Sequence, residues 1–119
     1  MAPVDLETRT TEFALRIIKL FSALPKTIEA QVLGKQLLRC GTSVGAHYRE
    51  AKRSKSTLDF VSKVEGALQE LDETCYWLEL IEKSGIMPAR RLESLRSEAI
   101  EITKILVTVV KHAKEKLKK

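Results

Sequence analysis

The chain has 119 residues with 44% hydrophobic content, which suits one domain with a single core spanning residues 1–119. Its formal net charge of +5 permits nucleic-acid binding without establishing it. No run of about 18 apolar residues occurs, so we expect no membrane-spanning helix, and the N-terminus lacks the features of a secretory signal. Cys40 and Cys75 both fall on apolar helical stripes, so we expect reduced thiols in a cytoplasmic protein.

Apolar residues at helical spacing predict two helices in the first half of the chain. The first begins between Asp5 and Thr11 and ends near Leu24, before a proline. The second opens after Thr27, a suitable N-cap, and runs to about Ser54. Their expected core stripes are Leu6, Phe13, Ile17, Leu20 and Leu24, then Leu33, Leu37, Cys40, Val44, Tyr48 and Ala51.

Two more helices are expected in the second half. The third opens at Ser56, with Asp59 as an acidic variant of the capping box, and closes at Gly85, since glycine adopts the left-handed C′ conformation without strain. The fourth starts near Pro88 and frays over residues 116–119. Long helices with short connections predict an all-α, antiparallel up-down-up-down four-helix bundle. The expected core stripes are Phe60, Val64, Ala67, Leu68, Leu71, Cys75 and Leu78, then Leu92, Leu95, Ala99, Ile102, Leu106, Val109 and Ala113.

A line of cations follows the second helix, roughly opposite its core stripe. A solvated helix face is the simpler interpretation. A phosphate-binding stripe is the functional one, because few acids lie among the cations. No aromatic residue is interleaved with them, so base stacking on that face is not indicated. The stripe comprises Lys35, Arg39, Arg49 and Arg53, and a C-terminal tail would add Lys111, Lys114, Lys116, Lys118 and Lys119.

Three glycines share one flank of the same helix: Gly34, Gly41 and Gly45. Each costs about 1 kcal/mol relative to alanine inside a helix. The flank therefore indicates either the close approach of another helix or a kink near Gly41.

The third helix carries a second apolar group at its C-terminal end, predicted to point away from its core stripe: Tyr76, Trp77, Leu80 and Ile81. Clustered apolar and aromatic residues of this kind are typical of interface centres. Local burial under the following loop is the alternative. Further apolar residues outside the core stripes also favour a homo-oligomer, namely Leu15, Ile18, Ile100 and Val107.

Charges are segregated between the two middle helices. Residues 65–82 contain six acids and no Lys or Arg, whereas residues 35–55 contain six bases and one acid. We expect salt bridges to neighbouring helices, each contributing about 0–1 kcal/mol.

No pattern of catalytic or metal-binding residues emerges. His47 and His112 lack the preceding Glu of a di-iron motif, and no Cys or His cluster has metal-ligand spacing. Ser43 and His47 lie one turn apart, but the pair has no evident orienting acid or oxyanion hole. We therefore expect a non-enzymatic protein with no metal and no cofactor.

Four segments together carry a family resemblance: residues 41–51, Asp59-Phe60, residues 72–74 and residues 76–80. They closely resemble the bacterial four-helix bundle proteins called 23S rRNA intervening sequence proteins, and the likeness extends over nearly the whole chain. Many members have Asn where this chain has His47, and Ala often stands where it has Leu71.

The resemblance implies a four-helix bundle and a ring-like oligomer, with a pentamer as the expected form. A related accessory protein of diversity-generating retroelements forms a basic pentameric barrel that engages nucleic acid and a reverse transcriptase. The family name records gene location and does not establish ribosome binding. Two functions stay open: binding of structured RNA or another nucleic acid through the basic face, or a structural or adaptor role with a protein partner and no nucleic-acid contact.

Overall fold

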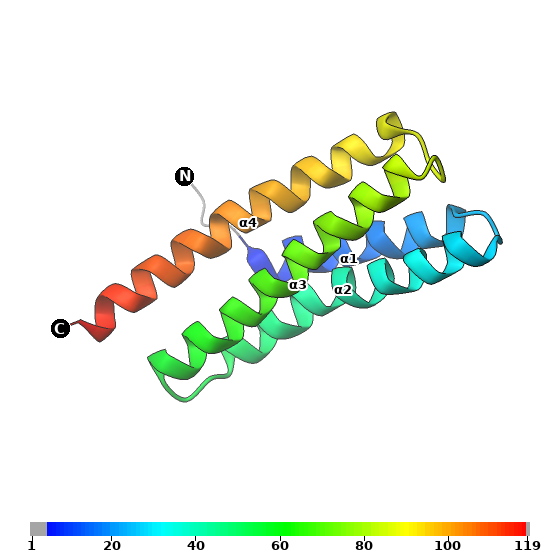
Figure 1. Cartoon of the computed structure of the whole chain (residues 1–119). Coiled ribbons are helices and arrows are strands. Elements are labelled where there is room, and N and C mark those ends of the chain that lie inside the picture. The colour runs from blue at the N-terminus through cyan, green and yellow to red at the C-terminus, as the bar shows by residue number, and fades with distance from the viewer. Residues whose placement is uncertain (1–4, 119) are drawn as a thin grey trace.

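A computed structural model of the chain describes residues 5–118. Within that range it consists of four α-helices and no strand: α1 Leu6–Ala23, α2 Ile28–Lys52, α3 Thr57–Lys83 and α4 Ala89–Leu117. Consecutive helices run antiparallel and are joined by short loops (Figure 1). The predicted all-α bundle and its three breaks are confirmed. No helix of residues 5–118 is both long and apolar enough to cross a membrane.

Local capping explains where the helices begin and end. Asp5, Thr27 and Ser56 each accept a hydrogen bond from the backbone amide three residues on, at the start of α1, α2 and α3. Gly85, after α3, has a φ of 78°, as its expected C′ role requires. α4 begins after Pro88 without a side-chain cap.

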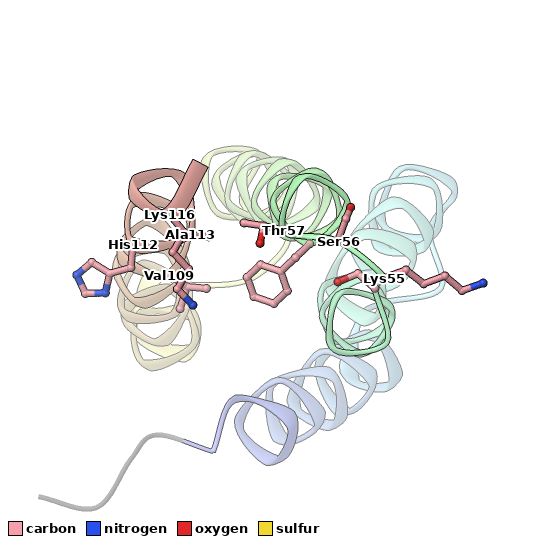
Figure 2. Close-up of a pocket in the computed structure, with 9 residues that line it drawn as sticks. Lys55, Ser56, Thr57, Val109, His112, Ala113 and Lys116 are labelled. Carbon is pink, nitrogen blue, oxygen red and sulfur yellow. The ribbon is translucent and has the colours of Figure 1, made fainter. Parts of the chain in front are cut away.

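The four helices form an open arrangement rather than a closed square. α2 and α3 pack most extensively, α1 lies against α2, and α4 lies against α3, whereas α1 and α4 barely touch. The end-on view in Figure 2 shows the separation between α1 and α4. We call the line between these two helices the α1–α4 seam.

The buried face of α3 differs from the prediction. Phe60, Leu68 and Cys75 are only half-buried, whereas Val61 and Ile81 are almost or completely inaccessible. The physical reason is that α3 packs against both α2 and α4, so its buried arc covers two flanks rather than one stripe. On α4, Val110 is likewise buried more deeply than the expected Val109.

The glycine flank of α2 lies against α1. A Cβ atom on Gly41 would come within 2.7 Å of the Ile17 side chain, and one on Gly34 within 2.6 Å of Leu24. α2 is an unbroken helix through these positions. The structure therefore supports close approach of a helix, and that helix is α1.

Candidate nucleic-acid interface

The predicted basic stripe on α2 is exposed, but two of its members are engaged by neighbouring helices. Arg39 Nη2 lies 3.1 Å from Glu73 Oε1, and its Nη1 lies 3.5 Å from Glu70 Oε1, both on α3. The hydrogen bond to Glu73 is the main cause that raises the pKa of Arg39. These contacts show that Arg39 leans towards the acidic face of α3.

Arg49 leans the other way, towards α1. Its Nε lies 3.7 Å from Glu7 Oε1, and its Nη2 donates to Thr11 Oγ1 at 3.0 Å. Lys35 and Arg53 are exposed and make no ion pair within residues 5–118. Arg39 and Arg49 thus form the expected salt bridges to neighbouring helices, because these long side chains reach across to carboxylates on both flanking helices.

The structure brings together a cluster that sequence spacing did not show. Cys40 is fully buried, its Sγ donates to Glu73 Oε1 at 3.5 Å, and burial above all raises the pKa of its thiol to about 11. Cys40, Glu70 and Glu73 place potential metal ligands within 4.8 Å of one another. The Arg39 guanidinium contacts both carboxylates and also donates to Cys40 Sγ at 3.2 Å. Because Arg39 already supplies a positive charge, we interpret the cluster as an ion-pair network joining α2 and α3.

Ser43 and His47 do not form a nucleophile pair. Ser43 Oγ donates to the backbone oxygen of Arg39 at 2.7 Å. His47 Nε2 instead lies 3.9 Å from Glu70 Oε2 on α3. Each side chain thus has a local partner on α2 or α3.

Cations gather at the end of the molecule where α2 and α4 both finish (Figure 1). Several of them make no ion pair with any residue from 5 to 118, in contrast to nearby Lys52 and Lys114, which pair with Glu7 and Glu65. Arg53 and Lys55 are separated in the sequence from the C-terminal lysines by the whole of α3 and most of α4, so sequence spacing did not show that they lie at the same end. We call this group the basic end: Arg53, Lys55, Lys111, Lys116 and Lys118.

A pocket of about 580 Å³ opens at the basic end. It lies between the last turns of α4, the first turn of α3 and the loop that precedes it (Figure 2). Figure 2 shows Lys55 and His112 on opposite sides of the opening, with both side chains directed outward. We call it the end pocket, lined by Ser54, Lys55, Ser56, Thr57, Phe60, Val109, His112, Ala113 and Lys116.

The predicted interface residues on α3 divide into three environments. The Tyr76 side chain is 53% exposed, Trp77 and Leu80 are half-buried, and Ile81 is completely buried. Ile81 therefore belongs to the core of its own bundle, which corrects the expectation that it points outward. The rings of Tyr76 and Trp77 lie 5.2 Å apart, and the indole N–H of Trp77 is buried without a hydrogen-bond partner among residues 5–118.

Large apolar side chains are exposed on all four helices. Leu15 on α1, and Ile100 and Val107 on α4, were expected outside the core and are each more than half exposed. α2 and α3 add others that the sequence analysis did not single out: Ile28, Val32 and Leu58.

The fold places the chain among the all-α four-helix bundle proteins. A family model described as 23S rRNA-intervening sequence protein matches residues 4–108, and the chain belongs to that family. It is similar to a crystal structure of a protein with unknown function from the S23 ribosomal protein family of Bacteroides thetaiotaomicron VPI-5482. The two are 39% identical with a TM-score of 0.83, over 88% of this chain and 97% of that one. No relative is found among curated proteins.

Proposed function

We propose that this protein is a non-enzymatic homo-oligomer that binds structured RNA or another nucleic acid electrostatically. The observation that carries the proposal is the basic end, where cations from the loop after α2 and from the end of α4 gather without ion-pair partners among residues 5–118. Lys35 extends this positive surface along α2, and Arg39 and Arg49 contribute where their carboxylate partners leave donors free.

Binding of this kind reads phosphate positions rather than base sequence. Unpaired lysines and arginines displace counterions from the nucleic-acid backbone, so affinity falls steeply as salt concentration rises. Phosphate contacts fix the orientation of a nucleic acid but carry little sequence information. We therefore expect the protein to bind RNAs of many sequences, provided that their phosphates have a suitable arrangement.

Assembly would multiply the effect of each basic end. The exposed apolar side chains, Tyr76 among them, support self-association, and the family resemblance gives five as the expected number of copies. One RNA that spans several subunits would gain avidity of roughly 10²–10⁴ over a single site. A modest affinity per subunit is then sufficient for stable binding.

The test is a titration with structured RNA at about 50 mM and about 200 mM salt. We compare wild type with the double variant Arg53→Glu, Lys111→Glu, two residues of the basic end that make no ion pair within the described part of the chain. The matched control is Lys26→Glu, Arg90→Glu, which makes the same change in net charge at the opposite end of the molecule.

The proposal predicts weaker binding for the first variant with every RNA tried, and near wild-type binding for the control. Equal losses in both variants would show that net charge alone matters. If wild type fails to bind RNA at about 50 mM salt, the nucleic-acid proposal is wrong. The adaptor function, with a protein partner and no nucleic-acid contact, then becomes the better one.

A further inference from the structure

The end pocket combines an aromatic wall with a cationic rim. Phe60, Val109 and Ala113 supply the apolar part of its lining, whereas Lys55 and Lys116 stand at its edge. The sequence placed no aromatic residue among the cations of α2. The fold does so, because the first turns of α3 bring Phe60 back beside the end of α2.

The pocket exists because the bundle is open at this end. α1 spans 18 residues and α4 spans 29, and the two helices barely touch, so the last turns of α4 are covered by α3 alone. Phe60 and Val109 consequently stay half-buried: they pack against the core and also form part of the pocket wall. An apolar surface of this shape accommodates a flat ring.

The charges around the pocket favour an anion. None of the nine lining residues is acidic, and Lys55 and Lys116 make no ion pair with residues 5–118. Two of the three hydroxyl groups are already engaged: Ser54 Oγ donates to the Ala51 carbonyl at 2.6 Å, and Ser56 Oγ accepts from the Asp59 amide at 3.0 Å. The lining thus supplies two unpaired lysines, of which Lys55 has its side chain directed away from the opening and must change rotamer to reach a ligand there (Figure 2).

We propose that the end pocket holds one unpaired nucleotide of the bound RNA, with its base against Phe60 and its phosphate near Lys55 and Lys116. This deepens the proposed function and depends on it. A flat base with an attached anion matches the pocket, whose volume of about 580 Å³ exceeds what a single phosphate needs. A base inside a duplex is already stacked and cannot enter, so the pocket selects loops, bulges and ends.

The test measures binding of a short unstructured RNA and of a duplex of equal length. Phe60→Leu keeps the apolar volume but removes the stacking surface, and Phe60→Tyr restores an aromatic ring. The matched control is Phe21→Leu, a half-buried phenylalanine on α1 that lies outside the end pocket. Thermal unfolding of each variant checks that the bundle is intact.

We expect Phe60→Leu to weaken binding of the unstructured RNA by about tenfold, with little effect on the duplex. Phe60→Tyr should bind nearly as wild type, and Phe21→Leu should bind as wild type. The double variant Lys55→Gln, Lys116→Gln should bind both the unstructured RNA and the duplex more weakly than wild type. An RNA containing 2-aminopurine adds an independent measurement, since its fluorescence should drop on binding to wild type and less so with Phe60→Leu.

Three results would overturn the inference. If wild type binds RNA and Phe60→Leu binds it equally well, the end pocket holds no base, although the proposed function stands. If Phe60→Leu changes the sedimentation coefficient instead, the pocket is a contact between copies of the chain. If wild type binds neither RNA, the proposed function itself fails, and the nucleotide site fails with it.

Discussion

Arg9 and Glu98 form a two-pronged ion pair across the α1–α4 seam. Arg9 Nε lies 2.8 Å from Glu98 Oε2, and Arg9 Nη2 donates to Glu98 Oε1 at 2.9 Å. One further polar link, from Arg16 Nη2 to Ser94 Oγ at 2.8 Å, joins helices that otherwise barely touch. The side-chain hydrogen bonds of the pair lower the pKa of Glu98 and raise the pKa of Arg9.

We predict that Glu98→Gln lowers the free energy of unfolding at neutral pH by about 0.5–1.5 kcal/mol, since a bidentate pair is stronger than an ordinary surface pair but partial exposure weakens it. Chemical denaturation of wild type, Glu98→Gln, Arg9→Met and the variant with both changes gives the coupling energy between Arg9 and Glu98. Glu93→Gln is the control, because Glu93 is an exposed acid on α4 without an ion pair among residues 5–118. A coupling of zero would show that the seam is held by other contacts.

The same pair predicts a pH dependence. The folded-state pKa of Glu98 is lowered from its usual value of 4.5, so the unfolded chain takes up the proton first as the pH falls. The stability that the Glu98 carboxylate contributes is therefore fully present above pH 4.5 and is lost as the pH drops through the folded-state pKa. Wild type should converge in stability with Glu98→Gln at low pH. A difference that stays constant from neutral to acid pH would contradict this.

We predict that Gly41→Ala destabilises the fold, whereas Gly66→Ala does so much less. The new methyl group at position 41 would lie 2.7–3.0 Å from three carbons of Ile17, which is completely buried and cannot move away. Overpacking of about 1–3 kcal/mol then exceeds the gain of about 1 kcal/mol in helix propensity. At Gly66 the nearest neighbour is the partly exposed ring of His47, at 3.1 Å, which has room to shift. Thermal unfolding of the two variants provides the comparison, and equal melting temperatures would count against it.

We predict that Tyr76→Glu weakens self-association without unfolding the subunit. Tyr76 is 53% exposed, so the new carboxylate costs little in a free subunit but is desolvated in a subunit contact. Trp77→Glu should impair both folding and assembly, because Trp77 also packs against the core. Gln69→Glu, at another exposed position on α3, is the control. Sedimentation should give an oligomer for wild type and the control, and a shift towards the 13.4 kDa subunit for Tyr76→Glu. A wild-type protein that sediments as a monomer would refute the assembly.

Cys40 should react slowly with alkylating reagents while the protein is folded. With its pKa raised to about 11, mainly by burial, roughly 10⁻³ of the thiol is ionised at pH 8, and the buried sulfur is also hard to reach. In the Cys75→Ser variant, Cys40 is the one thiol that can be alkylated. Mass spectrometry after iodoacetamide treatment should show little modification at pH 8 and rapid modification in denaturant. Fast labelling of the folded variant would show that the cluster around Cys40 opens readily.

The helices and their ends were predictable because they depend on local sequence. Thr27 and Ser56 cap their helices through contacts within the same turn, which do not depend on the rest of the fold. Gly85 adopts a positive φ that few other residues tolerate. Which flank of a helix is buried was less predictable. Ile81 looks like an outward residue when α3 is drawn with a single stripe, and it is buried because α3 has a neighbour on two sides.

The environment of the candidate site depends on neighbouring residues that are distant in the sequence, and these neighbours could not be predicted. Arg39 and Arg49 lie on the predicted outward arc of α2, yet each finds a carboxylate on a different helix. Phe60 joins Lys116 in one pocket only because α3 and α4 run antiparallel. A periodicity argument treats one helix at a time, so it predicts the cations but not their neighbours.

Trp77 gives the protein an internal optical probe. It is the chain's single tryptophan, it is half-buried, and its ring lies 5.2 Å from that of Tyr76 at the exposed surface of α3. Its buried indole N–H has no acceptor among residues 5–118, so the emission wavelength should respond when water or a carbonyl group from another subunit arrives. Dilution followed by intrinsic fluorescence would therefore report on events at this one position, without any label.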